Sequence, residues 1–84
     1  METDELFLTV QAVCAEVLGV PVESVTPAST LRDDLEADSL DVAELAMALE
    51  DKVGGSLPEQ KMKEVVTVSD AVDLVRQSLS AAAS

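Results

Sequence analysis

Ser39 is the residue in this sequence best placed to carry chemistry, because it stands in an acid-rich segment that reads as the start of a helix. Asp38 is a favoured N-cap residue, and Asp41 stands where the acid of a capping box sits. The pattern therefore predicts that Ser39 lies in the first turn of a helix, exposed to solvent. Free backbone N–H groups and the helix dipole make such a position favourable for an anion.

No residue nearby in the sequence can turn Ser39 into a catalytic nucleophile. The chain contains no histidine, and a hydroxyl needs an adjacent base to attack at neutral pH. Solvent-exposed carboxylates are weak bases, and their charge repels a developing oxyanion. We therefore expect no catalytic residue and no enzymatic activity. The pattern favours a serine that is itself modified.

A calcium-binding loop is the other function that an acidic segment suggests. An EF-hand loop needs oxygen ligands at its first, third and fifth positions, glycine at the sixth and glutamate at the twelfth. A loop that starts at Asp34 has Ser39 at the sixth position and Leu45 at the twelfth, so it does not fit. We expect no metal site; a small acidic module that binds divalent ions loosely or serves interactions is the less favoured alternative.

The segment from Asp34 to Glu50, DLEADSLDVAELAMALE, resembles the attachment motif of the acyl carrier proteins. The resemblance continues upstream in residues 18–20, Leu-Gly-Val, and downstream in residues 66–68, Val-Thr-Val. In that family the serine matching Ser39 carries 4'-phosphopantetheine through a phosphodiester. The resemblance implies that Ser39 is the cofactor-binding residue, and that the terminal thiol of the arm, which derives from coenzyme A, holds acyl chains as thioesters.

The same resemblance implies the partners of the chain, which are a phosphopantetheinyl transferase and the enzymes of acyl-chain biosynthesis. Basic patches on these enzymes would recognise the acidic second helix. The residues expected to serve this recognition are Asp38, Leu40, Asp41, Glu44 and Met47. Exposed apolar residues among acids suit an interface, because the apolar groups anchor the partner and the charges orient it. For Met47, partial burial at the helix edge is the alternative.

Two positions depart from the family pattern. Glu36 stands where glycine is usual, which costs free energy if the backbone there needs a positive φ. Val53 stands where phenylalanine is common. The Asp-Ser-Leu-Asp context is most similar to carriers of fatty-acid synthesis, and the departures keep a specialised polyketide or other secondary-pathway carrier as the alternative.

The charge of the chain narrows its partners further. Acidic residues number 17 against 5 basic ones, for a formal net charge of −12. Such a chain repels nucleic acid and anionic membranes and attracts basic protein surfaces. No segment is long and apolar enough for a membrane span or a signal peptide, so we expect a cytoplasmic protein. We also expect it to be a monomer. Cys14, the single cysteine, falls on the apolar side of the first helix, where core packing is its expected role.

Helical spacing of apolar residues organises the rest of the sequence. It predicts helices over 4–18, 39–53 and 59–64, followed by a last helix that a capping box of Thr67 and Asp70 begins. Gly19 and Gly54 follow the first two helices and should end them. The predicted fold is all-α, a small four-helix bundle with a long loop between helices 1 and 2 and a short third helix. It forms a single carrier domain over 1–84, with 80–84 frayed.

The long connection between the first two helices should pack as part of the fold. It is expected to contain at most a short helical turn near 31–35, and its apolar residues Val22, Val25, Leu31 and Leu35 are spaced to return to the core. The predicted buried stripe of the second helix is Val42, Leu45, Ala46, Leu49 and Val53, and that of the last helix is Val68, Val72, Val75 and Leu79.

Overall fold

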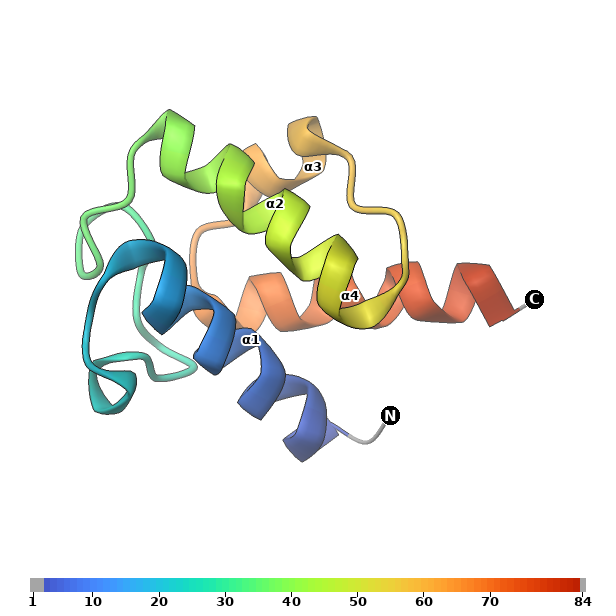
Figure 1. The fold of residues 1–84 in the computed structure, drawn as a ribbon, viewed down its shortest axis with the longest axis horizontal. Coiled ribbons are helices and arrows are strands. Elements are labelled where there is room, and N and C mark those ends of the chain that lie inside the picture. Colours follow the sequence, from blue (N-terminus) through green and yellow to red (C-terminus); the bar gives the residue numbers. More distant parts are fainter. Residues whose placement is uncertain (1–2, 84) are drawn as a thin grey trace.

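A computed structural model describes residues 3–83, with side-chain environments for residues 5–79. The chain forms four α-helices and one short 3-10 helix, in the order α1 (Thr3–Leu18), η1 (Val22–Ser24), α2 (Ser39–Val53), α3 (Glu59–Glu64) and α4 (Val68–Ala83). The described residues contain no β-strand. This arrangement confirms the predicted all-α fold, including the long first loop and the short third helix (Figure 1).

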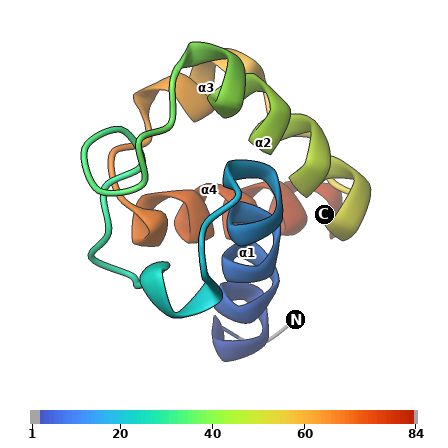
Figure 2. The same ribbon diagram turned by 60° about the vertical axis from the view of Figure 1, so that its left-hand side comes forward.

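Aliphatic side chains from all four helices meet in one core. α1 packs against both α2 and α4, while α3 lies against α2 (Figures 1 and 2). The fully buried side chains are those of leucine, methionine, valine, cysteine and alanine, and none is aromatic. The largest are Leu6, Leu31, Leu45, Leu49, Leu57 and Met62. Burial of these apolar surfaces is the main force that holds the helices together.

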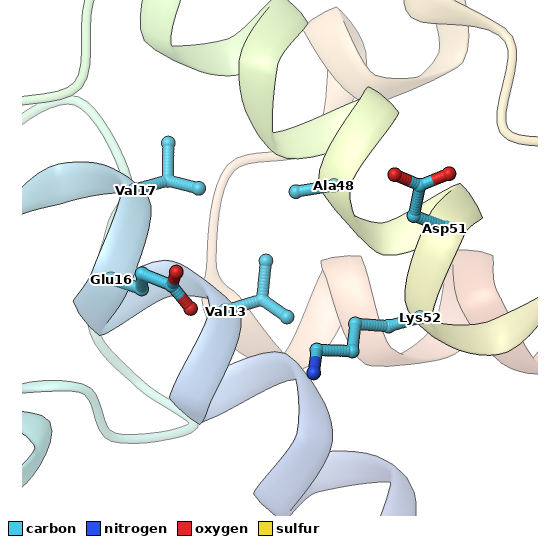
Figure 3. A pocket seen from close by; sticks show the side chains of 6 residues that line it. All are labelled: Val13, Glu16, Val17, Ala48, Asp51 and Lys52. Atoms are coloured by element: carbon cyan, nitrogen blue, oxygen red, sulfur yellow. The ribbon is translucent and has the colours of Figure 1, made fainter.

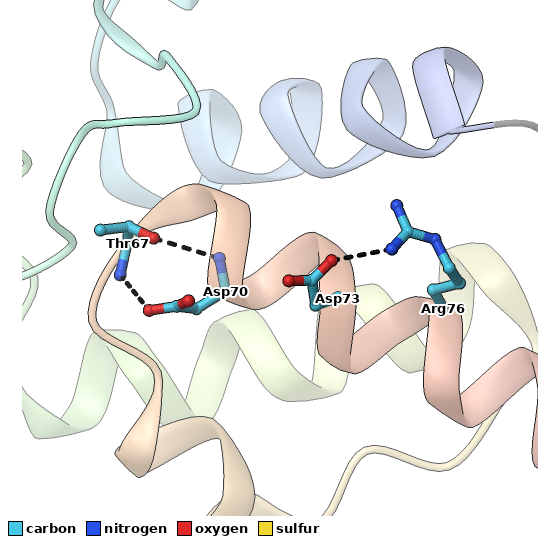
Figure 4. A network of polar contacts seen from close by, with 4 residues as sticks. All are labelled: Thr67, Asp70, Asp73 and Arg76. Carbon is cyan, nitrogen blue, oxygen red and sulfur yellow. Dashed lines mark hydrogen bonds and ion pairs between the residues drawn. The ribbon is translucent and has the colours of Figure 1, made fainter.

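Local signals in the sequence determine where the helices begin and end. α1 is followed by Gly19 at φ 66° and α2 by Gly54 at φ 76°, a left-handed conformation that glycine adopts without a steric penalty. Before α4, the Asp70 N–H donates to Thr67 Oγ1 at 3.1 Å, and the Thr67 N–H donates to Asp70 Oδ2 at 3.1 Å (Figure 4). The predicted capping box is therefore present.

The capping box makes the stability of the fold depend on the charge of Asp70. The hydrogen bond from the Thr67 N–H lowers the pKa of the Asp70 carboxyl below its ordinary value. A lowered folded-state pKa means that the carboxylate stabilises the fold above the unfolded-state pKa, and that this contribution is lost as pH falls through the folded-state pKa. We expect Asp70→Asn to destabilise the protein at neutral pH and to differ less from the wild type in acid.

Urea unfolding of wild type and Asp70→Asn over a pH series from neutral to strongly acid measures this effect. Asparagine keeps the shape and a carbonyl acceptor, so the comparison isolates the charge. A difference in free energy of unfolding that stays constant across the series would contradict the argument.

Two polar side chains fix the first half of the loop between α1 and α2. Gln11 Nε2, on α1, donates to the carbonyls of Val22 at 3.1 Å and Val25 at 2.9 Å. The Ser29 side chain is buried, and its hydroxyl donates to Ser24 O at 3.0 Å. Among the described residues, no buried side-chain nitrogen or oxygen lacks a hydrogen-bond partner. The loop is thus a packed part of the fold.

Most of the predicted core positions are buried, with three exceptions. Val22 was expected in the core but is 42% exposed, because η1 turns its side chain outward while its carbonyl is held by Gln11. Val53, the last residue of α2, and Leu79, in the C-terminal part of α4, are only partly buried. Val25, Leu31 and Leu35 do return to the core as predicted.

The helix α4 continues to Ala83. The fraying expected over 80–84 stays a prediction, because the side chains of 80–83 and the whole of Ser84 lie outside the described residues. None of the described helices is long and apolar enough to cross a membrane.

Candidate functional site

Ser39 is the first residue of α2, and its side chain is exposed. A capping box fixes the backbone around it: the Asp41 N–H donates to Asp38 Oδ1 at 2.9 Å, and the Asp38 N–H donates to Asp41 Oδ2 at 3.1 Å. Within the described part of the chain, the N–H groups of Ser39 and Leu40 have no hydrogen-bond acceptor. An anion bound at the hydroxyl would therefore meet free donors and the positive end of the helix dipole.

Backbone hydrogen bonds tie the segment before Ser39 to the far end of the chain. The buried Ala37 donates its N–H to Leu31 O at 2.8 Å, and the Leu31 N–H donates to Val66 O at 2.9 Å. The loop before α2 and the segment after α3 accordingly run side by side (Figures 1 and 2). Sequence reasoning missed this link, because nothing local in either segment marks its partner.

The turn predicted near residues 31–35 is present and is closed by side chains. The Thr30 N–H donates to Asp34 Oδ2 at 2.8 Å, and the Asp34 N–H donates to Thr30 Oγ1 at 3.0 Å. The turn buries Leu31 and Leu35, so the loop is anchored in the core on the side that leads to Ser39. Asp34 thus has a structural role in this turn.

The backbone of Glu36 has a positive φ, the left-handed conformation that costs free energy for a residue other than glycine. Its φ is 58°, and it is the sole described non-glycine residue with a positive φ. The flanking Leu35 and Ala37 are both buried, so this turn sends the chain out of the core and back into it. For a residue with a Cβ the conformation costs about 1–2 kcal/mol.

We expect Glu36→Gly to raise the free energy of unfolding by about 0.5–1 kcal/mol, because relief of strain exceeds the extra entropy that glycine gives the unfolded chain. Urea unfolding of the wild type, Glu36→Gly and Glu36→Ala measures it. Alanine removes the charge and keeps the strain, so it serves as the control. Equal stabilities of the glycine and alanine variants would show that backbone strain is not the cause.

An exposed stripe runs along α2 from the first turn onward. It consists of Leu40, Glu44, Met47 and Asp51, which recur at helical spacing opposite the buried face. Leu40 and Met47 are each 68% exposed, so the partial burial considered for Met47 is wrong. The two acids of the capping box are bound to backbone N–H groups, and the free charges of the stripe are those of Glu44 and Asp51.

Two adjoining surface pockets lie between α1 and α2, around the C-terminal half of α2. Their volumes are about 460 and 300 Å³, and both are lined by Val13, Glu16 and Lys52. In the larger pocket Val13 and Ala48 point toward each other, and the Lys52 side chain reaches toward α1 (Figure 3). Ser39 begins the same helix at its other end, so these pockets are separate from the serine.

The remaining candidate groups are inert. Among the described residues, no group of three or more histidine, cysteine, aspartate or glutamate side chains could hold a metal ion. Cys14 is buried, and burial raises the pKa of its thiol to about 11. The thiol is therefore protonated at neutral pH and packs in the core, as predicted.

Comparison with known proteins identifies the family. Residues 9–75 match the family model described as the phosphopantetheine attachment site, and this span contains Ser39. The chain belongs to the acyl carrier protein family. It is 43% identical over 75 residues to the acyl carrier protein of Rubrobacter xylanophilus, a match that covers 89% of this chain and 93% of the relative.

Two solved structures of acyl carrier proteins have the same fold. The acyl carrier protein from Thermotoga maritima superposes with a TM-score of 0.79 at 28% identity, covering 95% of this chain and 93% of that chain. The apo doublet acyl carrier protein from prodigiosin biosynthesis superposes with a TM-score of 0.77 at 31% identity, covering 92% of this chain and 38% of that chain.

Membership of the family establishes what kind of molecule this is. An acyl carrier protein is a carrier and not an enzyme, and it bears a covalent 4'-phosphopantetheine with which it serves biosynthetic enzymes. The start of α2 fits such a group, because it combines an exposed serine hydroxyl, a backbone fixed by a capping box and free N–H donors for a phosphate.

Proposed function

We propose that Ser39 is the attachment residue for 4'-phosphopantetheine and that this acyl carrier protein holds growing acyl chains in fatty-acid biosynthesis. The observation that carries the proposal is the exposed Ser39 hydroxyl on the first residue of α2, inside the matched region. By contrast, Ser29 is buried and hydrogen-bonded, and Ser78 donates to the carbonyl of Ser56.

The residues around Ser39 position the hydroxyl but do not activate it. Asp38 and Asp41 accept hydrogen bonds from backbone N–H groups, so they hold the helix start in place. The base that removes the serine proton must therefore come from the transferase. The bound arm supplies a flexible thiol that carries the acyl chain as a thioester. The free N–H groups of Ser39 and Leu40 are the donors available to its phosphate.

The Asp-Ser-Leu-Asp context of Ser39, which is most similar to carriers of fatty-acid synthesis, supports the fatty-acid pathway. The relative from Rubrobacter xylanophilus is matched over 93% of its length and is named simply an acyl carrier protein. The carrier from prodigiosin biosynthesis is a doublet, of which this chain covers 38%. A specialised secondary-pathway carrier is the second candidate, supported by Glu36 in its strained turn and by Lys61 and Lys63 on α3, where the family commonly has acids.

Charge and exposure also suggest how the carrier meets its enzymes. We propose that basic enzyme surfaces contact the exposed stripe of α2, with Leu40 and Met47 as apolar anchors and Asp38, Asp41 and Glu44 contributing negative charge. The net charge of −12 favours a monomer, because copies of the chain repel one another. We place this single carrier domain in the cytoplasm, where acyl-chain biosynthesis occurs.

An intact-mass measurement tests the attachment. The protein is incubated with coenzyme A and a broad-specificity phosphopantetheinyl transferase, and the modified peptide is mapped by fragmentation. A gain of one phosphopantetheine on the peptide that contains Ser39 is expected. An unchanged mass under conditions that modify another carrier would overturn the proposal.

A second step separates the two pathways. The modified carrier is supplied to purified fatty-acid elongation enzymes with malonyl and acetyl donors, and its mass is followed over time. Successive two-carbon extensions on the arm are expected for a fatty-acid carrier. Loading without extension would favour the secondary-pathway carrier.

A further inference from the structure

We propose that this carrier has a second contact surface of opposite charge beside Ser39, which receives an acidic side chain of the enzyme that attaches the arm. The surface is a hollow of about 200 Å³, here called the basic hollow, lined by Thr30, Arg32, Asp33, Lys63, Val65 and Val66. The inference rests on the proposed role of Ser39, because it concerns the protein that acts there.

The basic hollow combines cations with an apolar wall. Arg32 and Lys63 are exposed, and they are two of the 5 basic residues in the chain. Val66 is 59% exposed, and Val65 is half-buried beside it, so the basic hollow has an apolar wall that a partner can cover. A carboxylate on a short alkyl stem matches both features, since the charge meets the cations while the methylenes cover the valines.

The cations of the basic hollow are available to a partner. Within the described residues no ion pair or hydrogen bond engages the guanidinium of Arg32. Lys63 Nζ lies 3.6 Å from Glu59 Oε1, but both side chains are about half exposed, at 48% and 56%, so solvent weakens this pair. Asp33 is the one acid that lines the basic hollow, which leaves the lining with a net positive charge.

The basic hollow adjoins the serine through the backbone. Leu31, between Thr30 and Arg32, donates to Val66 O at 2.9 Å and accepts from the Ala37 N–H at 2.8 Å. Ala37 directly precedes the cap of α2. A specific protein interface covers about 800 Å² of each partner, so an enzyme seated over Ser39 also extends over these neighbouring segments.

The two surfaces together determine the orientation in which the enzyme docks on the carrier. The exposed stripe of α2 attracts basic groups, and the basic hollow attracts an acidic one. An enzyme docked with these two contacts exchanged would place like charges against each other at both surfaces. The basic hollow therefore selects the orientation as well as the partner.

Charge reversal in matched pairs tests the inference. The substrate is the full chain, and the probe is the phosphopantetheinyl transferase from the same organism, with coenzyme A. The test variant is Arg32→Glu/Lys63→Glu. The control is Lys52→Glu/Lys61→Glu, which makes the same change in net charge at two cations that line other pockets. Circular dichroism checks that both variants fold.

We expect kcat/KM for attachment to fall about tenfold or more in the test variant and less than about threefold in the control. The reversed charges of the test variant would face the acidic side chain of the enzyme inside the interface, whereas those of the control lie outside it. Arg32→Lys/Lys63→Arg should keep most of the activity. Equal losses in both charge-reversal pairs, or no loss in the test pair, would overturn the inference while leaving the role of Ser39 intact.

A titration of the isotope-labelled wild type gives a readout that does not depend on activity. Addition of the transferase should shift the amide resonances of Arg32, Lys63 and Val66 together with those of the α2 stripe. Shifts confined to α2 would place the whole interface there and overturn the inference. A wild type that gains no phosphopantetheine at Ser39 would instead overturn the proposed function on which this surface depends.

Discussion

Ser39→Ala is expected to gain no phosphopantetheine and to unfold at the same urea concentration as the wild type. The hydroxyl is the proposed point of attachment, and no other group at the start of α2 can replace it as the nucleophile. The side chain is exposed, and capping depends on Asp38 and Asp41, so the free energy of unfolding should change by less than about 0.5 kcal/mol.

Ser69→Ala is the matched control for this variant. Ser69 is also exposed and stands in the first turn of a helix, α4. It lacks the setting of Ser39 before the exposed stripe of α2, so the control should gain the full mass. Intact-mass measurement of all three proteins, with urea unfolding alongside, decides the matter. Modification of Ser39→Ala, or its loss in Ser69→Ala, would move the attachment site elsewhere.

Leu49→Ala is expected to lower the free energy of unfolding by about 3 kcal/mol. Leu49 lies on the inner face of α2 and is 0% exposed. Its truncation removes apolar contacts and leaves a space that a small aliphatic core cannot readily fill. Because a domain of this size has a total stability of roughly 4–13 kcal/mol, the loss is a large fraction of the whole.

Leu40→Ala makes the same chemical change on the opposite face of the same helix. Leu40 is 68% exposed, so we expect less than about 0.5 kcal/mol of destabilisation. The variant should instead weaken binding to the transferase if Leu40 anchors the partner. Urea unfolding separates the two leucines, and equal losses of stability would contradict the assignment of inner and outer faces.

The helices could be predicted because their signals are local. The structure has α2 and α3 with the predicted bounds, since a capping box opens α2 and Gly54 closes it in the left-handed conformation. Helical spacing also predicted the exposed Leu40, whereas for Met47 it left partial burial at the helix edge open. The position of Ser39 followed from the same local pattern.

The loop that positions Ser39 could be predicted only in part, because its hydrogen bonds join distant segments. Gln11 on α1 binds carbonyls of the loop, and Leu31 pairs with the backbone of Val66. A polar residue such as Gln11 carries no sequence signal for such a role. The outward turn of Val22 occurs in η1, where the carbonyl of Val22 accepts the hydrogen bond from Gln11.

The burial of Cys14 has a practical consequence for work on the loaded carrier. Its protonated thiol is enclosed in the core and reacts with alkylating reagents only when the fold opens. In the modified protein the thiol at the end of the arm is then the accessible one. A maleimide dye at neutral pH should label the arm selectively without removal of the native cysteine, and slow labelling of Cys14 in the same sample would report how often the core opens.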